Sequence, residues 1–485
     1  MKNEILRIEQ VLMEEDDMTF LENFNLHIFQ GEIMGLVCIN GNGREALIRL
    51  ITQNVPIHYG RVYFQEELVN SYQHSSLIRN KVAVIEQKSH LIEDLSVADN
   101  VFVLRRGFKK YYINNRVLND QVQRLLQDIE PDLDGNGLAA NLSPYEKCVI
   151  ELLRASIAGA KLVIIMDISN SVSAADLIKF HNLIRFYSKK GMSFLYVCNH
   201  HEEAFKVCDR MSLMKDGKIL KVFDQKNFTN ENMAPFYIGQ FSSLEERPVL
   251  PQNKESILSF CDVCTDALNR MSFSVGKGEC TVLFDTDNTA LPDIIELMKG
   301  SLKADSGNIL LEGTAYRPHR TRTPTDCGLA FVGEHSMIFK EMNYINNLCF
   351  LLDQKRNGIR LNQRIMKSII REYEPLVGSD IHEENVMNLK KQEIYDLIFY
   401  RIQLFRPKIV FYIQPFANAD LYLRRHLIDL ISQLKKQGTT VIFLSVNIAD
   451  SLVIADKLIL IKNGNFNGEY YRPEFKKFSS EGLVL

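Results

Sequence analysis

The chain has 485 residues, 46% of them hydrophobic, and its formal net charge is −3. This length suffices for two to four domains that each bury a hydrophobic core. The near-neutral charge argues against a protein that binds nucleic acid through bulk positive charge. No apolar run approaches the roughly eighteen residues of a membrane span, and the residues from Met1 to Ile5 lack an apolar signal region. We therefore expect a cytoplasmic protein without a membrane span of its own.

Several of the nine cysteines stand inside apolar stretches, among them Cys38, Cys198 and Cys280. Free thiols inside apolar strands are typical of proteins from a reducing compartment. The cysteines are therefore interpreted as reduced core residues of a cytosolic protein.

The segment from Gly31 to Leu47 has the layout of a phosphate-binding loop. A turn leads into an apolar strand expected at 33–37, an Asn-Gly-Asn-Gly turn follows, and an amphipathic helix is expected from about Glu45. This order lets backbone N–H groups and a helix N-terminus face a phosphate group. The glycines alone are equally typical of an ordinary tight turn.

Three substitutions alter the chemistry of this loop. The phosphate-loop pattern is Gly-x-x-x-x-Gly-Lys-Ser/Thr. Here Cys38 replaces the first glycine, Arg44 replaces the lysine, and Glu45 replaces the hydroxyl residue that binds Mg²⁺. Arginine keeps the positive charge but not the compact geometry of lysine. The candidate nucleotide-binding residues of the loop are Asn40, Gly41, Asn42, Gly43, Arg44, Glu45 and Ala46.

The sequence contains an internal repeat. Gly31-Glu32 recurs as Gly278-Glu279, a shift of 247 residues, and the stretch 208–217 recurs at 455–464 with the same shift. A period of this length indicates a domain duplication. We predict domains at 1–242 and 254–485, joined by a polar, proline-bearing linker at 243–253.

Short apolar strands alternate with helical patterns in both halves. Strands are expected at Leu162–Met166, Phe194–Cys198 and Thr440–Ser445, and amphipathic helices at Ser173–Ser188 and Asp420–Lys436. Near-continuous apolar strands between helices indicate a sheet that is buried on both faces. The predicted fold class is α/β.

Five motifs follow one another in a recognisable order. In the first half they are the loop at 31–47, then Val84–Gln87 with Leu95–Asn100, Leu142–Lys147, Ile164–Asp167 and Tyr196–Arg210. With these motifs the chain resembles an ATP-binding cassette (ABC) protein, and more narrowly the tandem-cassette ATPase subunit of ribose/galactose/xylose-type sugar importers. The resemblance covers both halves. It implies two tandem P-loop NTPase domains, each with a mixed, largely parallel sheet, flanking helices and a helical subdomain.

The resemblance also implies roles for single residues of the first cassette. ATP would contact the loop at 40–46, Gln87 and Ser143 of the signature motif, and Mg²⁺ would be held by Gln87 and Asp167. Asp167 at a strand end is equally well interpreted as a helix cap or as a solvated carboxylate.

Two positions of the first cassette lack the groups that the resemblance expects for catalysis. Ile168 stands where a glutamate would polarise the attacking water, so general-base assistance of roughly 10²–10⁴-fold is lost. Asn199 stands at the switch-histidine position. We therefore predict no catalytic residue.

The second cassette departs further from the family pattern. Its loop, Asp285–Pro292, has no glycine, and Leu291 replaces the lysine. Asp285 and Asp287 are expected to repel phosphate. At the end of the Walker B strand, the constant offset aligns Gln414 with the aspartate position of the family motif, and matching Pro415 to the family's proline aligns it with the glutamate position. Neither alignment supplies an acid. Val446 stands at the switch position.

The resulting hypothesis is an ABC-type protein derived from a carbohydrate importer ATPase. It binds ATP with Mg²⁺ at most in the first cassette, with weak or lost hydrolysis. It docks to membrane permease subunits or to a signalling partner, as a peripheral protein at the inner face of the cell membrane. The alternative is an active ATPase subunit that energises sugar import. A ribosome-associated cassette protein fits less well, because the linker is short and proline-bearing rather than long, charged and helical.

Overall fold

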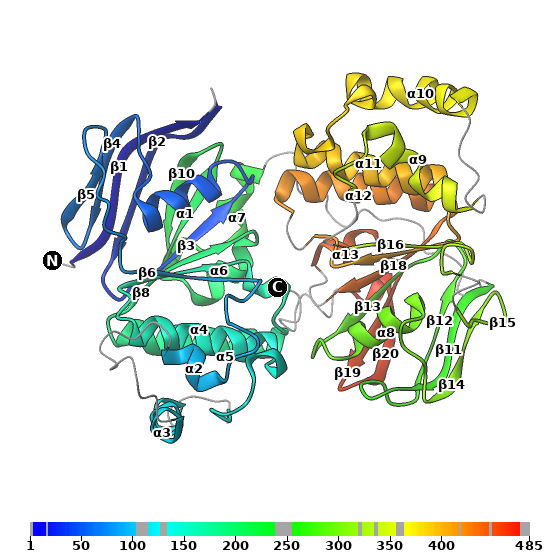
Figure 1. Cartoon of the computed structure of the whole chain (residues 1–485), viewed down its shortest axis with the longest axis horizontal. Coiled ribbons are helices and arrows are strands. Elements are labelled where there is room, and N and C mark those ends of the chain that lie inside the picture. Colours follow the sequence, from blue (N-terminus) through cyan, green and yellow to red (C-terminus); the bar gives the residue numbers. More distant parts are fainter. Residues whose placement is uncertain are drawn as a thin grey trace. The chain divides into compact units, whose positions relative to one another are not determined.

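A computed structural model of the chain describes residues 3–15, 18–102, 115–126, 133–237, 255–318, 323–333, 338–355, 363–416, 419–445 and 449–475. The chain divides into two compact units (Figure 1). The first unit is formed by Met1–Phe241 with the short segment Asp420–Tyr422, and the second by the rest of the chain. The predicted linker at 243–253 lies outside the described residues.

The first unit contains two sheets. Six strands form a mixed sheet in the order β10-β9-β3-β8-β7-β6, in which β9, β3, β8, β7 and β6 are parallel neighbours and β10 is antiparallel to β9. Its strands are β3 (Ile33–Cys38), β6 (Val82–Glu86), β7 (Leu162–Met166), β8 (Ser193–Cys198), β9 (Arg210–Lys215) and β10 (Lys218–Asp224). The antiparallel sheet, in the order β2-β1-β4-β5, is formed by β1 (Glu4–Glu15), β2 (Met18–Phe29), β4 (Tyr59–Phe64) and β5 (Glu67–Ser71).

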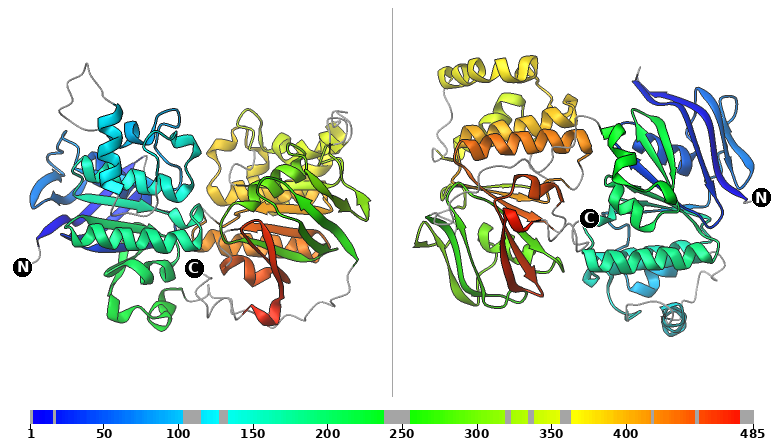
Figure 2. Two further views of the ribbon diagram at one scale, coloured as in Figure 1. Left: turned by 90° about the horizontal axis from the view of Figure 1, so that it is seen from below. Right: turned by 180° about the vertical axis from the view of Figure 1, so that it is seen from behind.

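The described helices of the first unit are α1 (Arg44–Gln53), α2 (Val97–Phe102), α3 (Asn115–Leu126), α4 (Pro144–Ile157), α5 (Ala174–Lys189), α6 (His201–Val207) and α7 (Asn230–Met233). They include some on each face of the six-stranded sheet and some, such as α3, that lie away from it. Leu47 and Leu50 of α1 share one apolar core with residues of β1, β2, β7 and β8, so α1 lies between the two sheets. His181 of α5 reaches Tyr196 on the opposite face of β8, where α4 and α5 run side by side (Figure 2). The predicted α/β fold is confirmed.

The second unit repeats this plan. Its six-stranded sheet has the order β16-β17-β18-β13-β19-β20, and its antiparallel sheet has the order β12-β11-β14-β15. The strands are β11 (Ser256–Cys264), β12 (Met271–Gly276), β13 (Cys280–Asp285), β14 (Ser306–Leu311), β15 (Thr314–Ala315), β16 (Leu329–Val332), β17 (Ile409–Ile413), β18 (Thr440–Ser445), β19 (Lys457–Lys462) and β20 (Asn465–Tyr471). The helices are α8 (Ala290–Lys299), α9 (Tyr344–Lys355), α10 (Gln363–Val377), α11 (Lys391–Phe405), α12 (Leu421–Lys436) and α13 (Ala449–Ile454). No helix among the described residues is both long and apolar enough to cross a bilayer.

The duplication holds at the level of single backbone contacts. Met166 pairs with Val197 in the first unit, and Ile413 pairs with Leu444 in the second, each shifted by 247 residues. The next residues, Asp167 and Gln414, both adopt a left-handed backbone with φ of 50° and 47°. Gln414 is therefore the structural counterpart of Asp167, which decides between the two registers that the sequence left open.

Two cysteines contradict the expectation that the thiols are core residues. Cys38, Cys198 and Cys280 are buried, free thiols as expected, whereas Cys261 is exposed and Cys264 is half-buried. Both lie on β11, whose pairing is interrupted by a bulge between Phe260 and Val263. The apolar alternation that buries a thiol is broken at this bulge.

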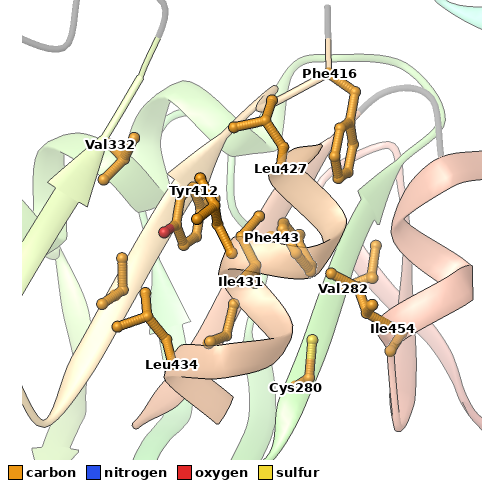
Figure 3. Close-up of a cluster of buried hydrophobic side chains, with 14 of the residues drawn as sticks. Cys280, Val282, Val332, Tyr412, Phe416, Leu427, Ile431, Leu434, Phe443 and Ile454 are labelled. Atoms are coloured by element: carbon orange, nitrogen blue, oxygen red, sulfur yellow. The ribbon is translucent and has the colours of Figure 1, made fainter. Parts of the chain in front are cut away.

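An apolar layer covers one face of the second unit's sheet (Figure 3). Phe443 of β18 is fully buried and its ring lies 5.8 Å from that of Tyr412 and 6.1 Å from that of Phe416, centroid to centroid. Leu427 and Ile431 of α12 pack against the same side chains. This layer fixes the position of the strand ends that follow it.

We expect Phe443→Ala to lower the free energy of unfolding of the second unit by about 3–5 kcal/mol, because removing a fully buried ring leaves a cavity. The matched control is Phe466→Ala on β20, where the ring is 40% exposed and the expected change is within about 0.5 kcal/mol. Denaturant unfolding of the full chain measures both variants. Equal losses in the two would contradict this view of the core.

Candidate functional site

The sequence-predicted residues of the first unit gather at one edge of its six-stranded sheet. Parallel strands bring their carboxyl ends together, and β3, β8, β7 and β6 are consecutive neighbours. The loop at 40–46 follows β3, Asn199 follows β8, Asp167 follows β7 and Gln87 follows β6. In the register of β6 and β7, Glu86 pairs with Met166, so Gln87 and Asp167 leave their strands at the same level.

The loop after β3 depends on a glycine and on an asparagine. Gly43 has φ of 80°, and a Cβ there would lie 2.2 Å from the Phe20 carbonyl oxygen, so no other residue fits without a shift of the backbone. The Asn40 amide donates to the Asp216 carboxylate (2.6 Å), and its oxygen accepts the Asp216 N–H (3.0 Å). These contacts tie the loop to the turn after β9.

The backbone donors at the start of α1 are unpaired, whereas the Gly41 N–H earlier in the loop donates to the Asp420 carboxylate at 2.9 Å. Within the described part of the chain, the N–H groups of Gly43, Arg44 and Glu45 make no hydrogen bond, and the first bond of α1 runs from the Leu47 N–H to the Gly43 carbonyl at 2.9 Å. Three unpaired donors at the start of a ten-residue helix, with Gly43 allowing close approach, fit a phosphate group.

Arg44 forms an ion pair with Asp167. One guanidinium nitrogen lies 2.5 Å from one carboxylate oxygen of Asp167, and the Asn199 amide donates to the other oxygen at 3.0 Å. Burial is the largest single effect and lowers the pKa of Arg44, but the raising effects, of which the charge of Asp167 is the largest, together outweigh it and the net shift is upward. Both oxygens of Asp167 are therefore engaged by the protein's own side chains.

These residues fit the phosphates of ATP better than they fit a metal ion. A Mg²⁺ ion held through Asp167 needs a carboxylate oxygen that Arg44 or Asn199 now occupies. The guanidinium group supplies positive charge at the same place. Gln87, the other predicted metal ligand, is half-buried at the end of its strand. Unlike Asp167, its side chain has no competing hydrogen bond to another described residue.

The remaining sequence-predicted positions have structural surroundings of other kinds. Ile168 is completely buried at the start of a 3-10 turn (Ile168–Asn170), so this position offers no proton acceptor to water. Ser143 caps α4, since its hydroxyl accepts the Glu146 N–H at 3.3 Å and the Glu146 carboxylate accepts the Ser143 N–H at 2.7 Å. Its role as a nucleotide contact stays a prediction. Val446 lies outside the described residues.

A buried polar network lies on the α5 face of β8, and the sequence reasoning missed it. The Tyr196 hydroxyl donates to the Glu203 carboxylate, which also accepts the Ser169 hydroxyl at 2.7 Å. The Nε2 atom of His181 lies 2.9 Å from the Tyr196 oxygen. Burial raises the pKa of Glu203 to about 7, and the charge of Asp167 adds to this shift. Burial lowers the pKa of His181 to about 3, so this ring stays neutral at physiological pH.

The sequence contained a partial signal for this network. Tyr196 and Glu203 flank the switch-motif positions, but only the fold shows that both side chains point into the protein. The spacing of Tyr196 and Glu203 in the sequence does not predict the hydrogen bond between them. Because Glu203 is 1% exposed, its carboxylate is closed off from solvent and cannot deprotonate an incoming water.

In the second unit's loop the corresponding backbone donors are paired and the cation is replaced. Leu291 is buried where Arg44 stands in the first unit, and the Asp285 carboxylate accepts the N–H groups of Ala290 and Leu291. Asp287 takes the place of Asn40: its carboxylate accepts the Asn463 N–H at 2.7 Å, as the Asn40 side chain accepts the N–H of Asp216, the counterpart of Asn463. Gln414, the counterpart of Asp167, provides no acid at the strand end. The two acids thus bind the chain's own backbone, which the sequence did not reveal.

Comparison with known proteins agrees with this geometry. Residues 21–167 match the profile of the ABC transporter family. The chain is similar to the ribose import ATP-binding protein RbsA of Clostridium perfringens, at 22% identity over 96% of this chain and 95% of that protein. It is also similar to the galactose/methyl galactoside import ATP-binding protein MglA of Escherichia coli, at 23% identity over 92% of this chain and 90% of that protein.

Two solved structures share the fold over nearly the whole chain. The structure of ribosome-bound archaeal Pelota and ABCE1 aligns with a TM-score of 0.64 and 14% identity, over 98% of this chain and 80% of the other. Archaeal ABCE1 in complex with the ribosomal stalk protein aligns with a TM-score of 0.58 and 13% identity, over 97% of this chain and 92% of the other. At these identities the likeness establishes the two tandem cassettes as a fold, and nothing about their partners.

We expect the free energy of unfolding to fall as pH rises from about 4.5 to about 7, the range between the ordinary and the folded pKa of Glu203. A raised pKa means that the folded state binds the proton more tightly, so this contribution is complete below the lower value and is lost as pH passes the upper one. The fall is about 3 kcal/mol. Glu203→Gln, which does not titrate, should flatten the profile.

The matched control is Glu202→Gln, the neighbouring residue on α6, whose side chain is 42% exposed. It should keep the slope of the unaltered protein in denaturant unfolding at a series of pH values. A Glu203→Gln profile as steep as that of the control would contradict the assignment.

Proposed function

We propose that this chain, a tandem-cassette member of the ABC transporter family, is an ATP-binding subunit derived from a carbohydrate importer. ATP binds at the first cassette only, and hydrolysis is weak or lost. The protein acts by docking to membrane permease subunits at the inner face of the cell membrane. Similarity to ribose and galactose import ATP-binding proteins over more than nine-tenths of this chain supports the carbohydrate importer. The cassettes at 1–242 and 254–485 and the linker at 243–253 belong to this proposal.

The observation that carries the loss of hydrolysis is the pairing of Arg44 with Asp167. An arginine buried against this carboxylate supplies the charge that Mg²⁺ would supply, but it does not activate a water. Ile168, directly after Asp167, removes the general base as well. Two independent contributions to the reaction are therefore missing from the same strand end.

Binding at the first loop has its own support. The open N–H groups of 43–45 and the Arg44 guanidinium would hold the phosphates, with Asn40 keeping the loop in place. ATP supplies its own negative charge, which the helix N-terminus and Arg44 offset. For Gln87 and Asp167 to hold Mg²⁺, the Arg44 side chain would first have to leave Asp167. We therefore propose that ATP binding does not require the metal.

A permease is the partner that the relatives support, and a signalling partner has no such support. The competing function is an active ATPase that energises sugar import. It requires turnover from a site whose base position is Ile168, and a hydrolysis measurement decides between the two.

Purified full-length protein with saturating Mg-ATP should turn over more than about 100-fold below the roughly 1 s⁻¹ at the lower end of ordinary enzymes. The physical reason is the absence of a proton acceptor at position 168. Phosphate release with and without the candidate permease measures it. Turnover of roughly 1–10³ s⁻¹ that disappears in Asp167→Ala would establish the active ATPase instead.

Calorimetric titration should find at most one ATP per chain, with an affinity that changes less than about tenfold when EDTA replaces Mg²⁺. Arg44→Ala should weaken binding by more than tenfold, since it removes the charge facing the phosphates. The matched control is Arg49→Ala, on the same helix but paired with Glu15 away from the loop. Two sites of similar affinity, or binding abolished by EDTA, would refute the proposal.

A further inference from the structure

The loop that follows β13 in the second unit differs in backbone path from its counterpart in the first unit. In the first loop the residue with a left-handed backbone is Gly43, with φ of 80°, directly before α1. In the second loop it is Asn288, with φ of 54°, and α8 begins at Ala290. Ala290 stands at the position of Gly43 in the 247-residue register, so α8 starts one residue earlier than α1. The backbone of the second loop therefore follows a different path, and a different contact holds it.

That contact is the Asp285 carboxylate. One of its oxygens accepts the N–H groups of Ala290 at 2.7 Å and Leu291 at 3.2 Å, and the other accepts the Asp287 N–H at 3.2 Å. Asp285 is completely buried, and the capping residue of α8, Thr289, makes no side-chain capping bond. The aspartate therefore supplies the acceptor that the first turn of α8 needs.

The register shows what this carboxylate replaces. Ala290 and Leu291 correspond to Gly43 and Arg44, whose N–H groups are open in the first unit. Asp285 itself corresponds to Cys38, which is buried and carries no charge there, since burial raises the pKa of its thiol to about 12. The same backbone donors make no hydrogen bond in the first unit and pair with an internal carboxylate in the second.

We propose that the Asp285 carboxylate is a built-in anion that permanently fills the phosphate cradle of the second cassette. It makes this unit independent of nucleotide for its folding and closes its loop to nucleotide. The proposal rests on contacts inside the second unit and does not depend on ATP binding at the first.

The hydrogen bonds around Asp285 favour its charged form, against burial and the charge of Asp287. Burial raises the pKa of Asp285, while the hydrogen bonds from Ala290, Asp287 and Leu291 oppose that rise by stabilising the charged form. A ten-residue helix adds the positive end of its dipole at the same place. An external phosphate would have to displace this carboxylate and would meet Leu291, which has no charge to offer. Exclusion of nucleotide follows from both effects.

Chemical rescue by inorganic phosphate tests the proposal. Asp285→Ala removes the internal anion and leaves three backbone donors unpaired, so the unfolding midpoint of the second unit should fall by about 5 °C or more. Phosphate at tens of millimolar should then restore a substantial part of that loss, because it re-enters the vacated cradle. The measurement is thermal unfolding of the full chain in phosphate against chloride at matched ionic strength.

The control is Asp287→Ala, two residues along the same loop. Asp287 accepts the Asn463 N–H outside the cradle, so its loss should lower the midpoint without a phosphate rescue beyond that of the unaltered protein. Any stabilisation of the first cradle by phosphate is common to all three proteins and cancels in the comparison. Failure of the proposed ATP site would therefore leave this result unchanged.

Either of two results would overturn the proposal: a midpoint of Asp285→Ala equal to that of the unaltered protein, or a loss that phosphate restores no better than it does for Asp287→Ala. If Asp285→Ala does not fold in chloride, the same comparison is made with Asp285→Asn, which keeps the side-chain shape and loses the charge. Folding of either variant in phosphate but not in chloride supports the proposal, and equal behaviour in both salts refutes it.

Discussion

The structure depends on how the unpaired N–H groups at the start of one helix are satisfied in each unit. A central parallel strand, β3 or β13, runs directly into a helix whose first turn has no intrahelical acceptor. In the first unit these donors are open beside Arg44. In the second they are paired with the Asp285 carboxylate. The first cassette therefore has backbone donors that still lack an acceptor, and in the second cassette the corresponding donors are already paired.

The same divergence extends to the sheet face behind the site. In the first unit Tyr196, Ser169 and His181 join Glu203 in a buried polar network. In the second unit the 247-residue register places Phe443, Phe416 and Ile428 at the first three of these positions, in or against the apolar layer. At three of the four positions a polar side chain of the first unit is therefore replaced by an apolar one in the second. This asymmetry accords with the proposal that ATP binds at the first cassette only.

The sequence predicted the strands and the repeat well, because both are periodic signals. The strands Leu162–Met166 and Thr440–Ser445 have the predicted bounds, since apolar runs of β-branched residues between polar turns leave little freedom. The site was predicted only as a set of positions. Residue types did not show that Arg44 turns to Asp167, nor that Asp285 turns inward to backbone donors rather than outward to repel phosphate, because those choices depend on side-chain directions that only the folded loop fixes.

A crystal structure of the full chain grown with saturating ATP tests the central claim most directly, namely that the chain's own side chains decide which cradle is open. The account predicts triphosphate density against the N–H groups of 43–45, and an Asp285 carboxylate still within hydrogen-bonding distance of Ala290 and Leu291 with no nucleotide beside it. Triphosphate density in the second loop, with Asp285 turned away from α8, would contradict it.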